Sequence, residues 1–143
     1  MPCVTWPYDP VIGPILVFGI TAPASMALRG APAPPIRWVK GLIDTGCSHT
    51  SLLSASTIAA NLPIVSKTTV LSTTHAMHAN IYLGDLHLGY NERGNNYHHT
   101  FPDIPFTELL RGDMNFDALV GRNVLSMGTL FLNGLANNFT FCW

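Results

Sequence analysis

The chain has 143 residues, which is the length of one domain, and 48% of them are apolar while only 10% are charged. The formal net charge is −1 and the seven Lys and Arg residues are scattered, so the sequence excludes a basic nucleic-acid-binding surface. No uninterrupted apolar run reaches the roughly 18 residues that a bilayer crossing requires, which excludes a helical membrane span. So little charge has two explanations: a Gly- and Pro-rich β protein with a polar but uncharged surface, or apolar surface that a second subunit covers.

The three cysteines are Cys3, Cys47 and Cys142, an odd number whose spacing matches no zinc site. We therefore expect neither a metal nor a cofactor. Reduced thiols in a cytoplasmic protein are the simplest account of them, and a Cys3–Cys142 bridge between terminal strands is the alternative.

In chain order, the first half of the sequence predicts strands separated by proline-rich loops, because short apolar runs alternate with clusters of Pro and Gly. The elements expected are an irregular segment at 1–12, a strand at 15–20, a loop at 29–35, a strand at 36–43 and a short helix at 54–61 with Ser54 as its N-cap.

The second half predicts a hairpin and then a set of closing strands. The elements expected are a strand at 67–73, a hairpin tip at 75–78, a strand at 80–88, a turn at 91–96, an extended stretch at 97–106, a short buried strand at 117–121, helical turns at 122–127, and strands at 129–132 and 138–143. The sum is a small, mostly-β single domain over residues 1–143.

One segment places a carboxylate in a turn at the end of a buried strand. The apolar pair Leu42 and Ile43 leads directly into Asp44-Thr45-Gly46. A carboxylate in this position emerges from the core into a tight turn and is partly desolvated. Thr45 offers a hydroxyl for a hydrogen bond, and Gly46 allows another backbone to approach closely.

One carboxylate alone is a poor catalyst of hydrolysis, whereas two that share a proton supply a general acid and a general base together. The chain contains no second Asp-Thr-Gly and no Asp-Ser-Gly. A two-fold axis through the site would supply the missing carboxylate as Asp44 of a second chain, and symmetric dimers are the commonest oligomers. The sequence therefore predicts a homodimer.

With the later run Ala-Leu-Val-Gly-Arg-Asn-Val-Leu at 118–125, the Asp44 segment resembles the retropepsin family of single-domain aspartic proteases. The resemblance covers residues 15–143 in order and length, and it is specific at those two segments. It implies a small, closed, β-barrel-like acid protease fold with one short helix after the Val-Gly-Arg-Asn motif. It also implies a homodimeric aspartic endopeptidase that hydrolyses a peptide or protein substrate.

The resemblance implies a role for each matching residue. Asp44 would be the catalytic carboxylate, Thr45 would brace the loops of the two subunits against each other, and Gly46 would place its carbonyl near the substrate backbone. The residues implied to contact substrate are Cys47, Ser48, His75, Ala76, Met77 and Val120. Those implied to support the catalytic loop from below are Gly121, Arg122 and Asn123.

A β-hairpin closes over the substrate in this family, and residues 67–88 are the candidate flap, with a tip at 73–78. The usual Gly-rich tip is absent here. We expect His75 and His78 to be exposed turn residues, and a role in tuning activity with pH is the alternative.

The sequence departs from the retroviral pattern at Ser48, where an Asp often pairs with the Arg of the later motif. Arg122 must therefore find another partner, for which Asp117, Asp103 and a backbone carbonyl are the candidates. In retroviral members the terminal strands of both subunits interleave, and residues 135–143 are the corresponding segment.

Two other functions stand beside the peptidase. The first is a catalytically inactive retropepsin-fold module for dimerisation or peptide binding, which Ser48 and the unusual hairpin tip favour and the intact Asp-Thr-Gly opposes. The second is a metal-dependent hydrolase that uses the histidines. Adjacent His98 and His99 would point to opposite faces of a strand, which is poor geometry for one ion.

Overall fold

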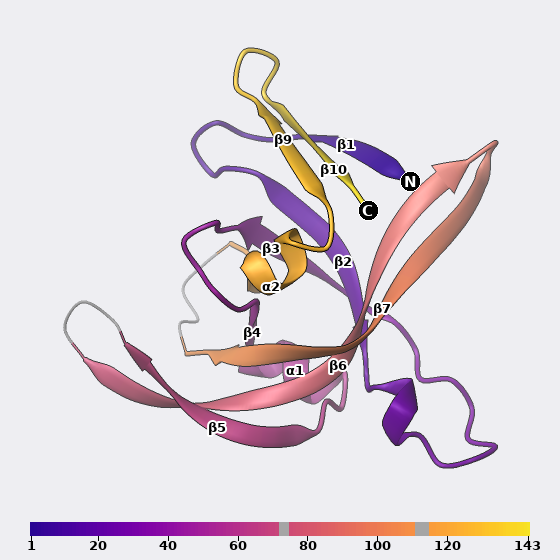
Figure 1. The fold of residues 1–143 in the computed structure, drawn as a ribbon, viewed down its shortest axis with the longest axis vertical. Coiled ribbons are helices and arrows are strands. Elements are labelled where there is room, and N and C mark those ends of the chain that lie inside the picture. The colour runs from indigo at the N-terminus through magenta and orange to yellow at the C-terminus, as the bar shows by residue number, and fades with distance from the viewer. Residues whose placement is uncertain (72–74, 111–114) are drawn as a thin grey trace.

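The computed structural model describes residues 1–71, 75–110 and 115–143, and most of its regular structure is β-strand (Figure 1). The strands are β1 (Cys3–Pro7), β2 (Ile15–Thr21), β3 (Arg37–Ile43), β4 (Ser51–Leu53), β5 (Ile64–Leu71), β6 (Ala76–Glu92), β7 (Asn95–Leu109), β8 (Ala118–Val120), β9 (Thr129–Asn133) and β10 (Asn138–Cys142). The helices are η1 (Ala24–Met26), α1 (Ser54–Ala59) and α2 (Arg122–Leu125). The predicted mostly-β class is confirmed. Within the described ranges, no helix has the length and apolarity needed to cross a membrane.

Six strands close into a barrel around the core. Their hydrogen-bonded order is β2-β3-β8-β4-β7-β6, and the pairing of β2 with β6 closes the ring. β2 forms because its alternate side chains Leu16, Phe18 and Ile20 point inward, where each is 0% exposed. The closed barrel predicted for the chain is therefore confirmed.

β8 lies between two strands that are consecutive in the sequence. It runs parallel to β3 and antiparallel to β4. Because β8 separates β3 from β4, the connecting loop at 44–50 must cross over the end of β8. This topology brings Asp44 next to Gly121, far along the chain.

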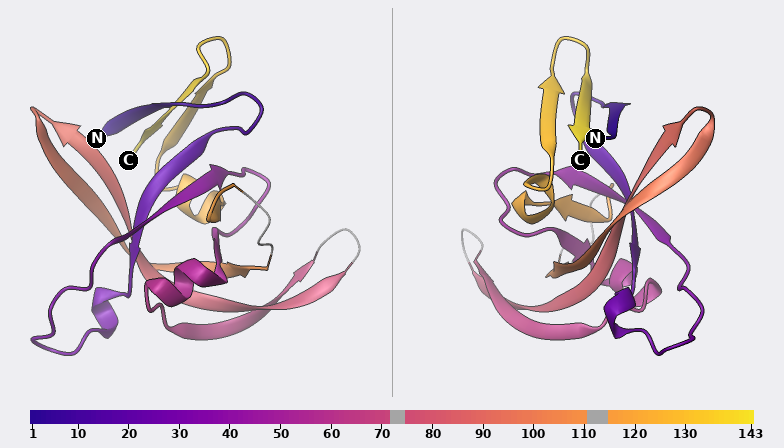
Figure 2. Two further views of the ribbon diagram at one scale, coloured as in Figure 1. Left: turned by 180° about the vertical axis from the view of Figure 1, so that it is seen from behind. Right: turned by 45° about the vertical axis from the view of Figure 1, so that its right-hand side comes forward.

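β6 and β7 are 17 and 15 residues long, and they project from the barrel at both ends (Figures 1 and 2). At one end β6 pairs with β5 as far as Leu71 opposite Ala76, which gives the hairpin predicted over 67–88. Residues 73 and 74 of its predicted tip lie outside the described residues. At the other end Arg93 and Gly94 have φ of 52° and 83° and form the predicted turn between β6 and β7.

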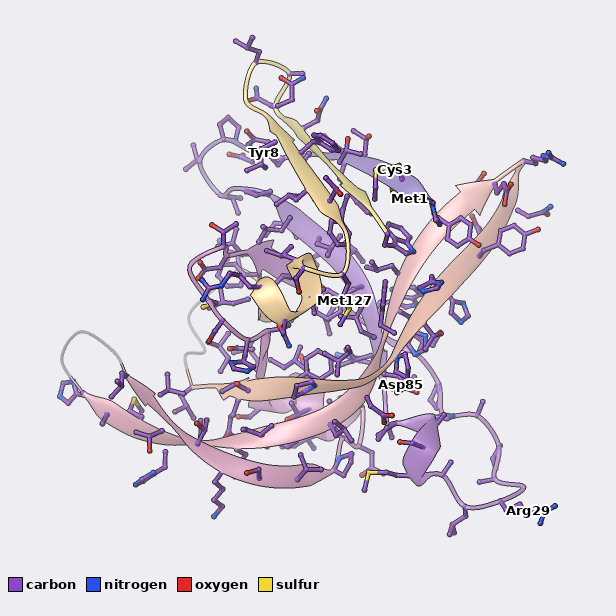
Figure 3. The ribbon with its side chains drawn as sticks, viewed as in Figure 1. Met1, Cys3, Tyr8, Arg29, Asp85 and Met127 are labelled. Atoms are coloured by element: carbon purple, nitrogen blue, oxygen red, sulfur yellow. A yellow bond between two sulfur atoms is a disulfide. The ribbon has the colours of Figure 1, made fainter. Side chains whose placement is uncertain are left out.

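The two ends of the chain meet in a three-stranded sheet of order β1-β10-β9 (Figure 1). Cys3, labelled in Figure 3, lies opposite Cys142 in this sheet, and the two form a disulfide. Two expectations are therefore wrong. Residues 1–12 are not irregular throughout, because Cys3–Pro7 pairs with β10, and Cys3 and Cys142 are not free thiols. The cysteines therefore give no support for a cytoplasmic location.

Residues 135–143, the segment that corresponds to the interleaving strands of retroviral members, pair within their own chain. β10 has β1 on one edge and β9 on the other, so both of its edges are already paired. Phe139 and Phe141 are 0% and 1% exposed, because they pack into the core of their own chain. Trp6 stacks on Phe139 with ring centroids 5.3 Å apart.

One local prediction also needs correction. The helix predicted at 54–61 is present as α1, but Leu53 is its N-cap residue and no side chain caps it. Ser54 instead donates a hydrogen bond to Glu108 Oε1 at 2.8 Å, because β4 carries it against β7. The helical turns predicted at 122–127 are present as α2, which begins at Arg122.

Candidate active site

Asp44 is the first residue after β3, at the point where the strand leaves the core. Its backbone N–H donates to the carbonyl of Val120 at 3.0 Å, so the β3–β8 pairing continues to this residue. Ile43 before it is 9% exposed, Asp44 is half-buried, and Thr45 and Gly46 after it are exposed. The backbone of Asp44 is therefore held by the sheet, while the turn that follows it is open to solvent.

Each oxygen of the Asp44 carboxylate accepts a hydrogen bond from within the turn. The Gly46 N–H donates to Oδ1 at 2.9 Å, and the Cys47 thiol donates to Oδ2 at 3.2 Å. The Cys47 N–H also donates to the Asp44 carbonyl at 3.2 Å, which closes the turn. These bonds fix the orientation of the carboxylate plane.

The environment of Cys47 keeps its thiol protonated. Burial raises its pKa most, the hydrogen bond to Asp44 and the negative charge of Asp44 add to this, and Arg122 opposes them, so that the pKa rises to about 11. The thiol therefore stays a hydrogen-bond donor to Asp44 at neutral pH.

Arg122 holds the loop through backbone carbonyls, which settles which of its candidate partners it uses. Its Nη1 donates to the carbonyl of Thr45 at 2.9 Å and to that of Gly46 at 3.2 Å. Asp117 instead accepts the backbone N–H of Lys40, and Asp103 accepts the hydroxyl of Ser25. An Asp at position 48 would have shared in supporting the loop. In its absence, Arg122 supports the loop from below through these two carbonyls.

Asn123 and Thr50 form a second support beneath the loop. Asn123 Oδ1 accepts from the N–H and the hydroxyl of Thr50 at 2.7 and 2.9 Å, and Asn123 Nδ2 donates to the Pro105 carbonyl at 3.0 Å. Thr50 Oγ1 accepts the Gly121 N–H at 3.0 Å, and Thr50 is 0% exposed. Asn123 was predicted from the sequence but Thr50 was not, because the sequence offers no signal for it beyond a threonine before an apolar pair.

Gly121 is required by close packing against this loop. A Cβ added there would lie 2.4 Å from the carbonyl carbon of His49 and 2.8 Å from the backbone nitrogen of Thr50. Both are backbone atoms of the loop, and the hydrogen bond from the Thr50 N–H to Asn123 holds them in place. Any larger side chain would push the loop away from α2.

The residues predicted to contact substrate fall into three groups. Ser48 is exposed in the loop, with its hydroxyl 3.0 Å from His49 Nδ1. His75, Ala76 and Met77 are exposed at the end of the β5–β6 hairpin, which projects on the same side of the barrel as the 44–50 loop (Figures 1 and 2). Val120 does not fit the prediction, because its side chain is 0% exposed beneath the loop and only its carbonyl serves Asp44.

The histidines on β7 point to different neighbours. The ring of His98 packs edge-on against His87 at 5.2 Å, and the ring of His99 packs against Phe101 at 4.7 Å. His87 lies between two hydroxyls, 3.0 Å from that of Thr21 and 2.9 Å from that of Thr100. His98 and His99 therefore point in different directions, as expected for adjacent strand residues, and do not converge on one position where an ion could bind.

The whole fold resembles one solved structure described as a retropepsin-like aspartic protease from Rickettsia conorii. The TM-score is 0.60 and the sequence identity 12%, and the match covers 98% of this chain and 89% of that one. No family model matches the sequence, and no curated protein matches it either. The chain therefore has a retropepsin-like fold.

Proposed function

We propose that this protein is an aspartic endopeptidase whose catalytic pair consists of Asp44 from each of two identical chains. The observation that carries the proposal is the state of the Asp44 carboxylate. It emerges from a buried strand, each oxygen is oriented by a donor in its own turn, and the loop that bears it is open to solvent. One such loop supplies half of an acid–base pair.

In the proposed reaction the two Asp44 carboxyl groups share one proton, because like charges in contact do not both ionise. The ionised carboxylate takes a proton from a water molecule, whose oxygen adds to the carbonyl carbon of the scissile peptide bond. The protonated carboxyl gives its proton to the carbonyl oxygen. Collapse of this intermediate breaks the C–N bond as a proton passes to the leaving nitrogen.

The substrate is proposed to be a peptide segment in extended conformation. It would lie between the Asp44 loops and the β5–β6 hairpin, which would act as the flap, and pair with the protein backbone like an added strand. His75, Ala76 and Met77 at the hairpin end would face it from above. The carbonyl of Gly46 has one hydrogen bond to Arg122 and keeps a lone pair for a substrate N–H. Apolar residues are expected on both sides of the cleaved bond.

The test of this proposal is Asp44→Asn, assayed against a peptide library across pH. We expect hydrolysis to fall by roughly a thousandfold or more, because the amide neither accepts a proton from water nor shares one. Glu92→Gln, which also removes one carboxylate but lies exposed at the far end of β6, is the control and should keep full activity. Circular dichroism and sedimentation should be unchanged in both variants.

Cleavage by Asp44→Asn at the wild-type rate would refute the proposal. A wild-type protein that cleaves nothing, yet is stabilised against heat by a statine-type transition-state mimic, would instead be a non-catalytic peptide-binding module.

A further inference from the structure

Strand β9 leaves one edge of the terminal sheet open. It pairs with β10 on one side, and no strand in the described part of the chain pairs with it on the other. Such edges normally carry charges, proline or a bulge that prevents pairing with another chain. β9 reads Thr-Leu-Phe-Leu-Asn and pairs in unbroken register, and residues 123–143 contain no charged residue at all.

The side chains of β9 add apolar surface beside the open edge. Phe131 and Leu132 point to opposite faces of the strand, and they are 60% and 57% exposed. Met127, labelled in Figure 3 between α2 and β9, is 37% exposed. Large apolar groups this exposed on an uncharged strand are typical of a surface that a partner covers.

This surface is continuous with the candidate active site. A hollow of about 540 Å³ is lined by Thr45 of the loop, by α2 and by Leu130 and Leu132 of β9. A second copy that brings its Asp44 beside the first must therefore approach over the same surface. The catalytic pair is incomplete without that copy.

The two terminal strands already pair with each other within their own chain. β1 is held to β10 by five consecutive residue pairs and by the Cys3–Cys142 disulfide. An exchange of terminal strands between two chains would have to undo this pairing first. The open edge of β9 is the part of the terminal sheet that remains for a partner.

We propose that two copies of this chain pair antiparallel through their β9 edges, each keeping its own terminal strands, to give one continuous sheet of order β1-β10-β9-β9-β10-β1. A two-fold axis perpendicular to the sheet makes two identical strands antiparallel by symmetry. The same axis would bring the two Asp44 loops together. This inference rests on the proposed function, because it is the shared carboxylate pair that requires a second copy.

The test compares Leu132→Lys with Leu28→Lys in sedimentation equilibrium and in peptide cleavage over a range of protein concentrations. Leu28 is the control, because it is 83% exposed and lies in the loop between η1 and β3, next to Arg29 and far from β9 (Figure 3). We expect Leu132→Lys to weaken the dimer about a hundredfold, since the symmetric interface receives two lysines. Its cleavage rate should recover as the protein is concentrated, and Leu28→Lys should behave as wild type.

A second measurement does not depend on how well Leu132→Lys folds. Phe131→Cys lies at the middle of β9, where a strand that pairs with its own copy meets itself, so oxidation should give a covalent dimer. Leu28→Cys should give none. Equal dimer affinity of the two lysine variants, or absence of cross-linking through Phe131→Cys, would overturn the interface even if the wild type cleaves peptides. A dimer that is weakened by Leu132→Lys and joined through Phe131→Cys, yet cleaves nothing, would keep the interface and refute the protease.

Discussion

Cys47 lies beside the carboxylate on which the proposed chemistry depends, and its reactivity reports on that carboxylate. Its thiol is held at 3.2 Å from Asp44 Oδ2. Burial first, and then the hydrogen bond to Asp44 and the charge of Asp44, raise the pKa of the thiol from 9.0 to about 11. A thiol in this state reacts slowly, because the thiolate is the nucleophile.

We predict that Cys47 reacts with iodoacetamide at pH 8 roughly a hundredfold more slowly than a free cysteine, since two pKa units lower the thiolate fraction by that factor. Asp44→Asn removes the nearby charge and should accelerate labelling, while burial continues to slow it. Mass spectrometry of the oxidised protein measures this directly, because Cys47 is its one free cysteine. Labelling of the wild type at the rate of a free thiol would contradict the geometry of the turn.

The residues of the site differ in how far the sequence revealed them. Asp44, Thr45 and Gly46 are contiguous, so the turn that they form can be predicted from the sequence alone. The supporting role of Arg122 was predicted, but its acceptors were not. They are main-chain carbonyls, which every residue carries, so the sequence does not distinguish them. Thr50 was missed because its role exists only where β4 and α2 meet.

At the scale of elements, His87 links three strands. It stands on β6, and its ring lies between the hydroxyls of Thr21 on β2 and Thr100 on β7. It is 7% exposed, and burial lowers its pKa, with a smaller lowering by His98 and an opposing effect of Asp85. Asp85, labelled in Figure 3, lies opposite Thr21 where β2 meets β6.

This arrangement predicts a loss of stability in mild acid. The unfolded chain binds a proton at His87 near pH 6.5, whereas the folded chain resists it to a lower pH, so the free energy of unfolding falls as pH drops below about 6.5. The fall continues until the pH reaches the lowered pKa of the folded state. Thermal unfolding of wild type and His87→Gln between pH 8 and 5 measures the effect, and the variant should show the shallower slope. Identical slopes would contradict the assignment, and His78→Gln tests whether removing any histidine has the same effect.

The elements themselves were predictable to different degrees. β2 and β3 follow from apolar runs that fill the barrel, and the β5–β6 hairpin follows from β-branched residues on one side of its tip. β4 has three residues, too few to show a period. The β1 strand was hidden by prolines that stand at or beyond its ends, at Pro2 and Pro7, where they cost little pairing.

At the scale of the whole molecule, the Cys3–Cys142 disulfide joins residues separated by 139 positions. A cross-link over so long a stretch removes much of the conformational freedom of the unfolded chain, and stabilisation of roughly 3 to 5 kcal/mol is expected. The sequence could not select this pairing, because the register that sets Cys3 opposite Cys142 is decided by the barrel between them.

We predict that reduction lowers the Tm by roughly 10 to 17 °C, as that loss of free energy implies for a chain of this size. Scanning calorimetry with and without dithiothreitol, at one fixed protein concentration, provides the measurement. The double variant Cys3→Ser with Cys142→Ser should match the reduced wild type and ignore the reductant. A Tm that does not respond to reduction would argue that the bond is absent or energetically silent.

The same bond closes residues 3–142 into a covalent ring. A single nick anywhere between the two cysteines, whether by a copy of the enzyme or by another protease, opens the ring but releases no fragment. Such a molecule would keep its mass on a non-reducing gel and separate into two bands only after the sulfurs part, so damage to an ageing preparation would pass unnoticed in oxidising buffer.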